Sequence, residues 1–278
     1  MIQNRAMLAN LSISRWKARK TDKKVSKEVT SHHGAAADSG DFRKTLIDKA
    51  HLKALTSSES AIRAYHYKMT LPWDDDGRRI LPSTLYSAYT DAMREFKRID
   101  QKLRLDFLAV YPRLVSEARQ RLGTMYDPAD FPDVTVIPTK FDIKIAFEQI
   151  PDAKDFRVAV SDEAAELIRE QISAENDLKF QAAMKDCFKR VHKVVSHISE
   201  TLRQEDPRIF DSLVTNARDL VDCLPGLNLT DDPTLEQFRV ELHAMLPTPE
   251  SLRASAHVRT TTADAADAIL AKMKHYMP

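Results

Sequence analysis

Glycine is the residue type that this sequence most lacks, with 5 among 278 residues, whereas an average protein has about 7%. Phosphate-cradling loops, doubly wound nucleotide folds and strained catalytic turns need glycine, either for positive φ angles or for close approach of a ligand to the backbone. The sequence also contains neither GxGxxG nor GxxxxGK[ST]. We therefore expect no nucleotide-binding fold of these types.

Cysteine and long apolar runs are scarce as well. The two cysteines, Cys187 and Cys223, do not form a CxxC motif, which argues against a disulfide framework or a zinc knuckle and favours the reducing cytoplasm. No stretch approaches the roughly 18 uncharged apolar residues of a membrane span. Near the N-terminus, basic residues follow a weak apolar segment, which is the reverse of the order in a secretory signal. We expect a cytoplasmic protein with no membrane partner.

Charge is balanced overall, with 42 Lys and Arg against 41 Asp and Glu, but it is unevenly distributed along the chain. Residues 1–55 contain 12 basic and 5 acidic side chains, and the densest basic run is the arm Arg15–Lys27. Basic side chains neutralise nucleic-acid phosphates, and an aromatic ring between them can stack on a base. The candidate nucleic-acid-binding residues are Arg15, Trp16, Lys17, Arg19, Lys20, Lys23, Lys24 and Lys27. The alternative is a solvated helix face that docks on the acidic remainder of the protein or on a protein partner.

Two long amphipathic helices are predicted by apolar residues that recur at steps of three or four. The first covers residues 83–122 and should kink at Pro112, and the second covers residues 162–205 with Ser161 as its N-cap. Because the two apolar stripes have nearly equal lengths, we expect the helices to pair antiparallel and to bury these stripes against each other. Farther on, a shorter helix should begin after Asp232 as N-cap.

Apolar residues alternate in steps of two between the long helices, at Val134 and Val136, at 141–147 and at 156–160. This period predicts a small antiparallel β insertion at about residues 134–160. The expected fold is mainly α, a long antiparallel helical hairpin with this β insertion and flanking short helices. The chain then divides into a basic N-terminal arm and linker, short helices with a proline-bounded turn, the hairpin, and a C-terminal helical segment: residues 1–40, 41–82, 83–205 and 206–278.

Three adjacent aspartates, Asp74–Asp76, are the best candidate for catalysis. They could hold Mg²⁺ beside Arg78 and Arg79, as in a metal-dependent phosphotransferase or nuclease. Neighbouring side chains point in different directions, however, and a turn explains the same run. His192 and His197 are five residues apart and lack the i, i+4 spacing of a zinc pair, and no GxSxG motif occurs. We assign no catalytic residue, metal or cofactor; a non-enzymatic role is favoured, with activity at the aspartates left open.

Four stretches of the sequence carry a resemblance to a known family: SRWKARKTDKKVSKEV, HHGAAADSGDFRKTLI, YHYKMTLPWDDDGRRILP and NLTDDPTLE. Over about residues 12–246 the chain resembles an uncharacterised family of tailed-phage and prophage proteins, catalogued as a domain of unknown function. The resemblance implies a phage accessory protein, encoded near a MoxR-like AAA ATPase and a von Willebrand A-domain protein. It implies no fold, activity or site residue.

We therefore predict a non-enzymatic, phage-type interaction or scaffolding protein in the host-cell cytoplasm. Its long amphipathic helices would make it a homo-oligomer and could also bind a protein partner such as an AAA ATPase. The alternative is a nucleic-acid-binding accessory protein that uses the arm Arg15–Lys27. This alternative predicts binding that weakens steeply with salt.

Overall fold

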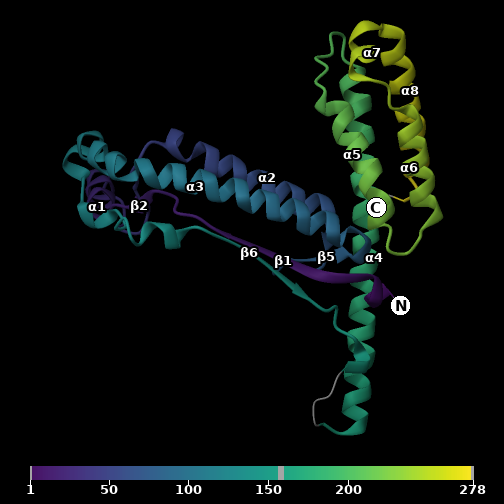
Figure 1. Cartoon of the computed structure of the whole chain (residues 1–278), viewed down its shortest axis with the longest axis horizontal. Helices are drawn as coiled ribbons and strands as arrows, with labels where there is room; N and C mark the ends of the chain where they lie inside the picture. The colour runs from purple at the N-terminus through teal and green to yellow at the C-terminus, as the bar shows by residue number, and fades with distance from the viewer. Residues whose placement is uncertain (1, 156–159, 277–278) are drawn as a thin grey trace. The chain divides into compact units, whose positions relative to one another are not determined.

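The structure, a computed structural model, describes residues 2–155 and 160–276. It confirms a mainly α-helical protein with a small antiparallel sheet (Figure 1). The α-helices are α1 (Lys23–His32), α2 (Lys53–Met69), α3 (Tyr86–Leu122), α4 (Asp162–Leu202), α5 (Ser212–Leu227), α6 (Pro233–Met245), α7 (Pro249–Ala254) and α8 (Ala256–Met273). The two long predicted helices are therefore present as α3, which contains Pro112, and α4.

Of the six strands in the described residues, one lies in the predicted β insertion and the other five lie outside it. The six are β1 (Ala6–Ser14), β2 (Arg19–Thr21), β3 (Arg43–Thr45), β4 (Leu71–Pro72), β5 (Arg78–Pro82) and β6 (Asp142–Glu148). A four-stranded sheet has the order β4-β5-β1-β6, and β2 pairs with β3 in a second sheet. β1 runs antiparallel to β5, from the pair Ala6 and Pro82 to the pair Asn10 and Arg78. The N-terminal segment therefore supplies a sheet strand, where the sequence had predicted part of a basic arm.

The predicted β insertion at 134–160 contributes one strand, β6, among the described residues. Val134 and Val136 are exposed in a turn and do not form a strand. The turn forms because the carboxylate of Asp133 accepts hydrogen bonds from the backbone N–H and the hydroxyl of Thr135. The remaining predicted strand, at 156–160, lies almost entirely outside the described residues.

The chain folds into two compact units, each assembled from separated stretches. Unit 1 comprises Met1–Asn10, Tyr65–Tyr89 and Ala146–Pro278, and unit 2 comprises Leu11–Ala64 and Thr90–Ile145. The sequence had suggested consecutive segments instead. The difference arises because sheet pairing and helix packing join residues that are distant in the sequence, which local periodicity does not encode.

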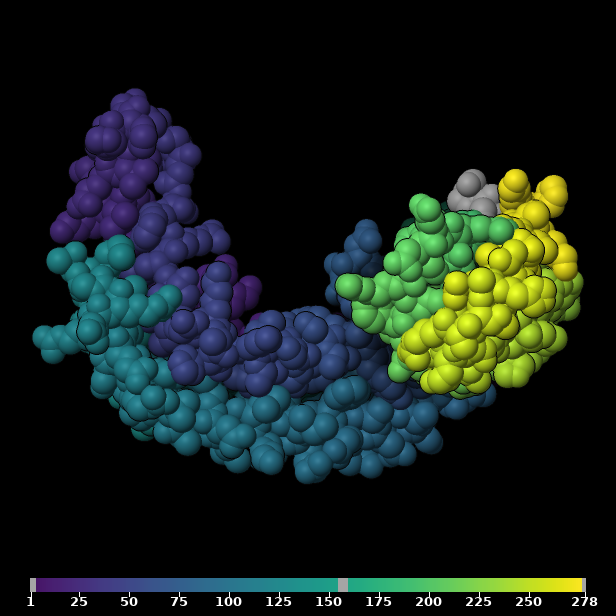
Figure 2. Space-filling view, turned by 90° about the horizontal axis from the view of Figure 1, so that it is seen from above, coloured from purple at the N-terminus to yellow at the C-terminus, as the bar shows by residue number. Residues whose placement is uncertain are grey.

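Helix α4 is central to unit 1. α8 packs along it, and α5 and α6 also contact it; Figure 2 shows these C-terminal helices, coloured green to yellow, as one close-packed mass. The covered positions of α4 are apolar and recur at helical spacing: Phe180, Ala183, Cys187, Phe188, Val191, Val195, Ile198 and Leu202. From Phe180 onward the predicted apolar stripe of this helix is buried, mainly by α5, α6 and α8, whereas Leu167 and Leu178, in its first half, are exposed.

The core of unit 2 is built on α3. One face of this helix packs with residues from α2, from the segment before it and from the loop after α3. The buried cluster comprises Ala18, Leu46, Ile47, Leu52, Leu55, Phe107, Tyr111, Leu114, Ala118, Leu122, Phe131, Ile137 and Phe141. The stripes of α3 and α4 are therefore each covered within their own unit, which corrects the prediction that these two helices bury one another. Among the described residues, no helix is long and apolar enough to cross a membrane.

Candidate nucleic-acid interface in unit 2

A groove of about 540 Å³ in unit 2 is lined by five cationic side chains. Arg15 and Lys17 lie in the connection between β1 and β2, and Arg19 is the first residue of β2. Lys49 belongs to the 3₁₀ turn Lys49–Leu52, and Lys53 is the first residue of α2. The other lining residues are uncharged: Ala50, Leu52, Thr56 and Ser57. The groove therefore presents positive charge without a carboxylate among its lining residues.

A bend at Ala18 places two of these cations. Ala18 has a positive φ of 49°, which is uncommon for a residue other than glycine, and it is 1% exposed. Its carbonyl accepts a hydrogen bond of 2.8 Å from the backbone N–H of Leu46. Lys17 and Arg19 flank this buried residue and are both exposed. Backbone strain of this kind concentrates at functional sites, because the surrounding structure must hold it.

Arg15 is the best anchored cation of the groove. One of its terminal nitrogens, Nη2, lies 2.8 Å from the Oε2 atom of Glu59, and its side chain is 18% exposed. The other terminal nitrogen, Nη1, is buried and has no hydrogen-bond partner among the described residues. An unsatisfied buried donor costs about 1–3 kcal/mol. An anionic oxygen that entered the groove could satisfy it.

Trp16 is used in packing. Its ring meets the ring of Tyr111 edge-on at 5.4 Å between centroids and lies 6.4 Å from that of Phe107. Both neighbours belong to the buried core of unit 2. The sequence left open whether this ring stacks on a base or docks on the protein itself. In the structure it holds the basic segment against the core, which explains why Arg15 and Lys17 on either side of it face the groove.

The remaining candidates, from Lys20 to Lys27, do not line the groove. Only the last part of the segment Arg15–Lys27 is helical: α1 begins at Lys23, because Asp22 acts as N-cap and accepts hydrogen bonds from the backbone N–H groups of Lys24 and Val25. Lys20 lies 3.9 Å from the carboxylate of Asp130. Lys23, Lys24 and Lys27 are exposed on α1. The structure thus brings together three of the eight candidates, Arg15, Lys17 and Arg19.

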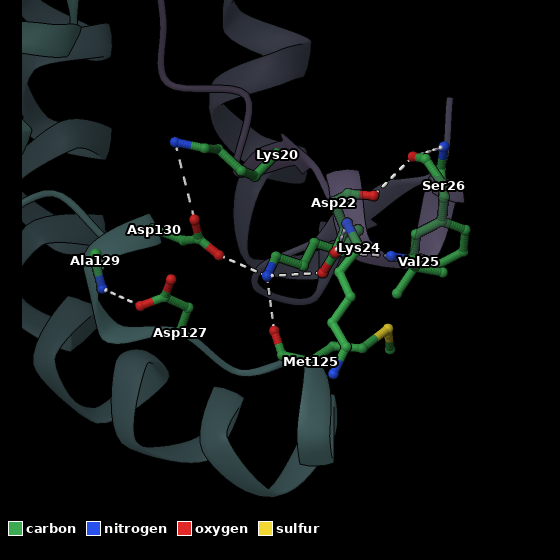
Figure 3. Close-up of polar contacts among 11 residues, drawn as sticks. Lys20, Asp22, Lys24, Val25, Ser26, Met125, Asp127, Ala129 and Asp130 are labelled. Atoms are coloured by element: carbon green, nitrogen blue, oxygen red, sulfur yellow. Dashed lines mark hydrogen bonds and ion pairs between the residues drawn. The ribbon is translucent and has the colours of Figure 1, made fainter. Parts of the chain in front are cut away.

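A buried lysine, Lys44, holds this part of unit 2 together. Its side chain is 7% exposed, and its Nζ atom lies 2.7 Å from Asp130, 3.1 Å from Asp22 and 2.7 Å from the carbonyl oxygen of Met125. Figure 3 shows Asp22, Asp130 and Met125 arranged around one ammonium group. Since Lys44 lies in β3, which pairs with β2, these contacts fix the strand that carries Arg19.

The network around Lys44 favours its charged state. Burial alone lowers the pKa of Lys44, but the hydrogen bonds to Asp130 and Asp22 outweigh it and raise the pKa above its ordinary value. The backbone N–H of Val25, followed by Lys44, lowers the pKa of Asp22. Asp22 and Asp130 therefore balance the positive charge of Lys44. The role of Lys44 is to position the groove and not to bind a ligand.

The sequence did not identify three lysines of this site: Lys44, Lys49 and Lys53. Lys49 and Lys53 are four residues apart, so the i, i+4 spacing of two lysines was a usable signal for a shared face. No local signal marks Lys44, because its partners follow it in the chain by more than 80 residues or precede it by 22. Its importance comes from tertiary packing alone.

The aspartate run Asp74–Asp76 in unit 1 forms a turn. The carboxylate of Asp74 accepts hydrogen bonds from the backbone N–H of Arg78 at 3.2 Å and from its Nε atom at 2.7 Å. Asp75 and Asp76 are exposed. The described residues hold no group of three or more His, Cys, Asp or Glu side chains that could bind a metal ion. The alternative prediction, that this run forms a turn, explains the position of Asp74.

The two cysteines and the most buried histidine are also packed inside the protein. Burial raises the pKa of the Cys187 thiol to about 12, and it raises the pKa of Cys223 as well. Such thiols are poor nucleophiles near neutral pH. The Nδ1 atom of His66, which is 3% exposed, lies 2.8 Å from the hydroxyl of Tyr89. We find no reason to place catalysis at these residues.

The groove must be interpreted from its own geometry. No family model matches the chain, and no curated protein or solved structure is detectably similar to it.

Proposed function

We propose that this protein is a non-enzymatic nucleic-acid-binding protein, which contacts phosphates through the basic groove of unit 2. The observation that supports the proposal best is the convergence of Arg15, Lys17, Arg19, Lys49 and Lys53 on one groove with no carboxylate among the lining residues. Phosphate contacts by Lys and Arg provide most of the affinity in non-specific nucleic-acid binding, because they release condensed counterions.

The charge of unit 2 as a whole favours the same ligand. Unit 2 contains 22 Lys and Arg against 15 Asp and Glu, a net charge of +7, whereas unit 1 contains 20 against 26, a net charge of −6. A basic field of this size raises the local concentration of a polyanion and accelerates its association. The near-neutral charge of the complete chain conceals this field.

The groove predicts little sequence specificity. Trp16 is packed in the core, and the five cations can pair with phosphates of any sequence. With four or five phosphate contacts, the logarithm of the binding constant should fall with the logarithm of salt concentration at a slope of about −4 for a duplex and about −3 for a single strand. Oligonucleotides of different sequence but equal length should bind with similar affinity.

Fluorescence anisotropy with labelled oligonucleotides at several salt concentrations tests the proposal. The variant Lys49→Gln, Lys53→Gln should weaken binding by about tenfold and reduce the salt slope by about two. The matched control is Lys97→Gln, Lys102→Gln, which removes two exposed lysines from α3 in the same unit. Binding that is insensitive to salt, or equal losses in both double variants, would rule out the groove as the nucleic-acid site.

Self-association as a scaffold of phage type is a second candidate, favoured by the first half of α4. Leu167 and Leu178 are 63% and 65% exposed, and their spacing of three turns puts them on one helix face. Residues 162–178 carry six acidic and one basic side chain, so the complementary occupant is the basic unit 2 of a second copy. This interaction should produce dimers or larger species in light scattering that dissociate in high salt; a monomer at all concentrations would exclude it.

A further inference from the structure

A second cavity, of about 600 Å³, lies within unit 1 between α4 and α5, next to the end of α2 and to β5. α4 contributes Asp186, Arg190 and Lys193 to one wall, and α5 contributes apolar side chains such as Leu213 and Leu220 to the other. Cavities of this volume, with apolar walls and a few placed polar groups, are typical of small-molecule sites.

Arg190 is held in place at this cavity. Its Nε atom donates to the carboxylate of Asp186 at 2.8 Å, while Nη1 donates to the carbonyl of Lys68 at 2.9 Å and Nη2 to the carbonyl of Thr70 at 2.6 Å. All three nitrogens are therefore engaged. Arg190 gives the cavity a fixed positive group whose own hydrogen-bonding needs are largely met.

Arg79 lies beside it and is only partly satisfied. Its Nε and Nη2 atoms donate to the hydroxyl and the carbonyl of Thr70 at 2.8 Å and 3.1 Å. Its guanidinium carbon is 4.5 Å from the centre of the Tyr67 ring, which fixes its plane. Among the described residues, no hydrogen-bond acceptor for Nη1 and no carboxylate partner is found. Burial, and then the charge of Arg190, lower the pKa of Arg79.

The ion pairs around the cavity leave an excess of positive charge. Two of the lining cations have carboxylate partners, since Arg190 pairs with Asp186 and Lys68 pairs with Asp219 at 2.9 Å. Arg79 and Lys193 form no ion pair with a described residue. This cationic site therefore occurs in the unit whose net charge is −6, which points to a local requirement for an anion.

We propose that this cavity binds a small organic anion, whose phosphate or carboxylate group is held by Arg79 and whose apolar body lies against the α5 wall at Leu213 and Leu220. Lys193 adds positive potential at the opening, where its side chain is exposed. A charge-assisted hydrogen bond from the free Nη1 atom would fix the anionic group. The site lies within unit 1 and does not depend on the nucleic-acid groove of unit 2.

Calorimetric titration of the 278-residue chain tests this inference with four probes. 2-Naphthyl phosphate and 2-naphthoate combine an anionic group with a flat apolar body, whereas 2-naphthol lacks the charge and inorganic phosphate lacks the body. We expect one or both naphthyl anions to bind at one site at least about tenfold more tightly than 2-naphthol and inorganic phosphate. The preferred anion shows whether the natural ligand carries a phosphate or a carboxylate.

Variants then locate the bound anion. Arg79→Gln should weaken binding by about tenfold, and Lys193→Gln, which removes an exposed side chain and should leave the fold intact, by a few fold. Lys189→Gln, on the same helix but outside the cavity lining, is the matched control and should bind like the unaltered protein. Lys49→Gln, Lys53→Gln should also leave binding unchanged.

Three outcomes would overturn the inference. They are the absence of saturable binding by both naphthyl anions, equal affinities for Lys193→Gln and Lys189→Gln, and loss of binding in the variant of the unit 2 groove.

Discussion

The two units differ most clearly in what their cations face. In unit 2, five cationic side chains converge on a groove whose lining holds no carboxylate. In unit 1, the lining of the cavity between α4 and α5 contains two carboxylates, Asp186 and Asp219, which pair with Arg190 and Lys68. A formal net charge of +1 for the chain is thus the sum of two opposite fields. Overall composition is a poor guide to ligand class when charge is sorted by unit.

The units also differ in how they position their cations. Unit 2 uses a buried lysine, Lys44, and a strained backbone at Ala18, whereas the cavity of unit 1 uses hydrogen bonds from Arg79 and Arg190 to backbone carbonyls at the end of α2. The first arrangement depends on a lysine buried between two carboxylates, whereas the second relies mainly on backbone carbonyls, with one ion pair between Arg190 and Asp186. This difference can be tested by substitution and by pH.

The largest effect should follow the removal of Lys44. Lys44→Met leaves Asp22 and Asp130 without their common cation, and breaking a buried pair in this way costs about 3–5 kcal/mol. Urea denaturation followed by circular dichroism measures the loss of stability. Arg98→Met is the control, because Arg98 forms an exposed pair with Glu95 whose removal should have little effect. Equal losses in the two variants would show that Lys44 is not a structural support.

A smaller effect, which distinguishes the two units, is expected on the stability of the protein at acidic pH. The pKa of Asp22 is lower in the folded protein than its ordinary value of 3.8, so its contribution to stability is present above that value and is lost as the pH falls through the folded pKa. Asp22→Asn keeps an N-cap residue for α1 but removes the charge. We expect it to reduce stability at pH 7 and to flatten the loss of stability below about pH 4.

The control for acid sensitivity comes from unit 1. Asp231 forms an exposed ion pair with Arg5, and its pKa is lowered mainly by that arginine. Because exposed pairs are screened by solvent, Asp231→Asn should change the pH dependence less than Asp22→Asn. Identical pH profiles for the two variants would contradict the proposed role of the Lys44 network.

The smallest effect tests the strain at Ala18. Glycine adopts positive φ freely, so Ala18→Gly gains about 1 kcal/mol in conformational energy and loses about 0.8 kcal/mol of methyl burial. We expect the stability to stay within about 0.5 kcal/mol of the original. Ala118→Gly, in α3 and 2% exposed, should cost about 1.5–2 kcal/mol, since both terms are unfavourable there. Thermal unfolding measures both; a large loss for Ala18→Gly would exclude strain at this residue.

The starts of α4 and α6 followed from the sequence because their signals are local. α4 begins after Ser161, whose hydroxyl accepts the N–H of Ala164, and α6 begins after Asp232, as predicted. The helix that covers each apolar stripe could not be predicted from the sequence. α3, the predicted partner of α4, and α8, its observed partner, offer α4 the same kind of apolar surface. β1 was missed because its pairing partner, β5, lies more than 60 residues away.

The candidate groove was only partly visible in the sequence. Density of basic residues identified Arg15, Lys17 and Arg19, but it could not separate them from Lys20, which lies near Asp130, or show that Trp16 faces the core. Such distinctions depend on which side of a bend a residue occupies. The bend itself is set by Ala18, a residue type that carries no turn signal.

The interleaved connectivity of the units has a consequence for biosynthesis. The polypeptide passes between them four times, after residues 10, 64, 89 and 145. All of unit 2 is therefore translated before most of unit 1, so the basic groove can form before helices α4 to α8 are complete. No single truncation or proteolytic cut yields either unit alone, so the basic groove and the unit 1 cavity cannot be isolated in two intact units by shortening the chain.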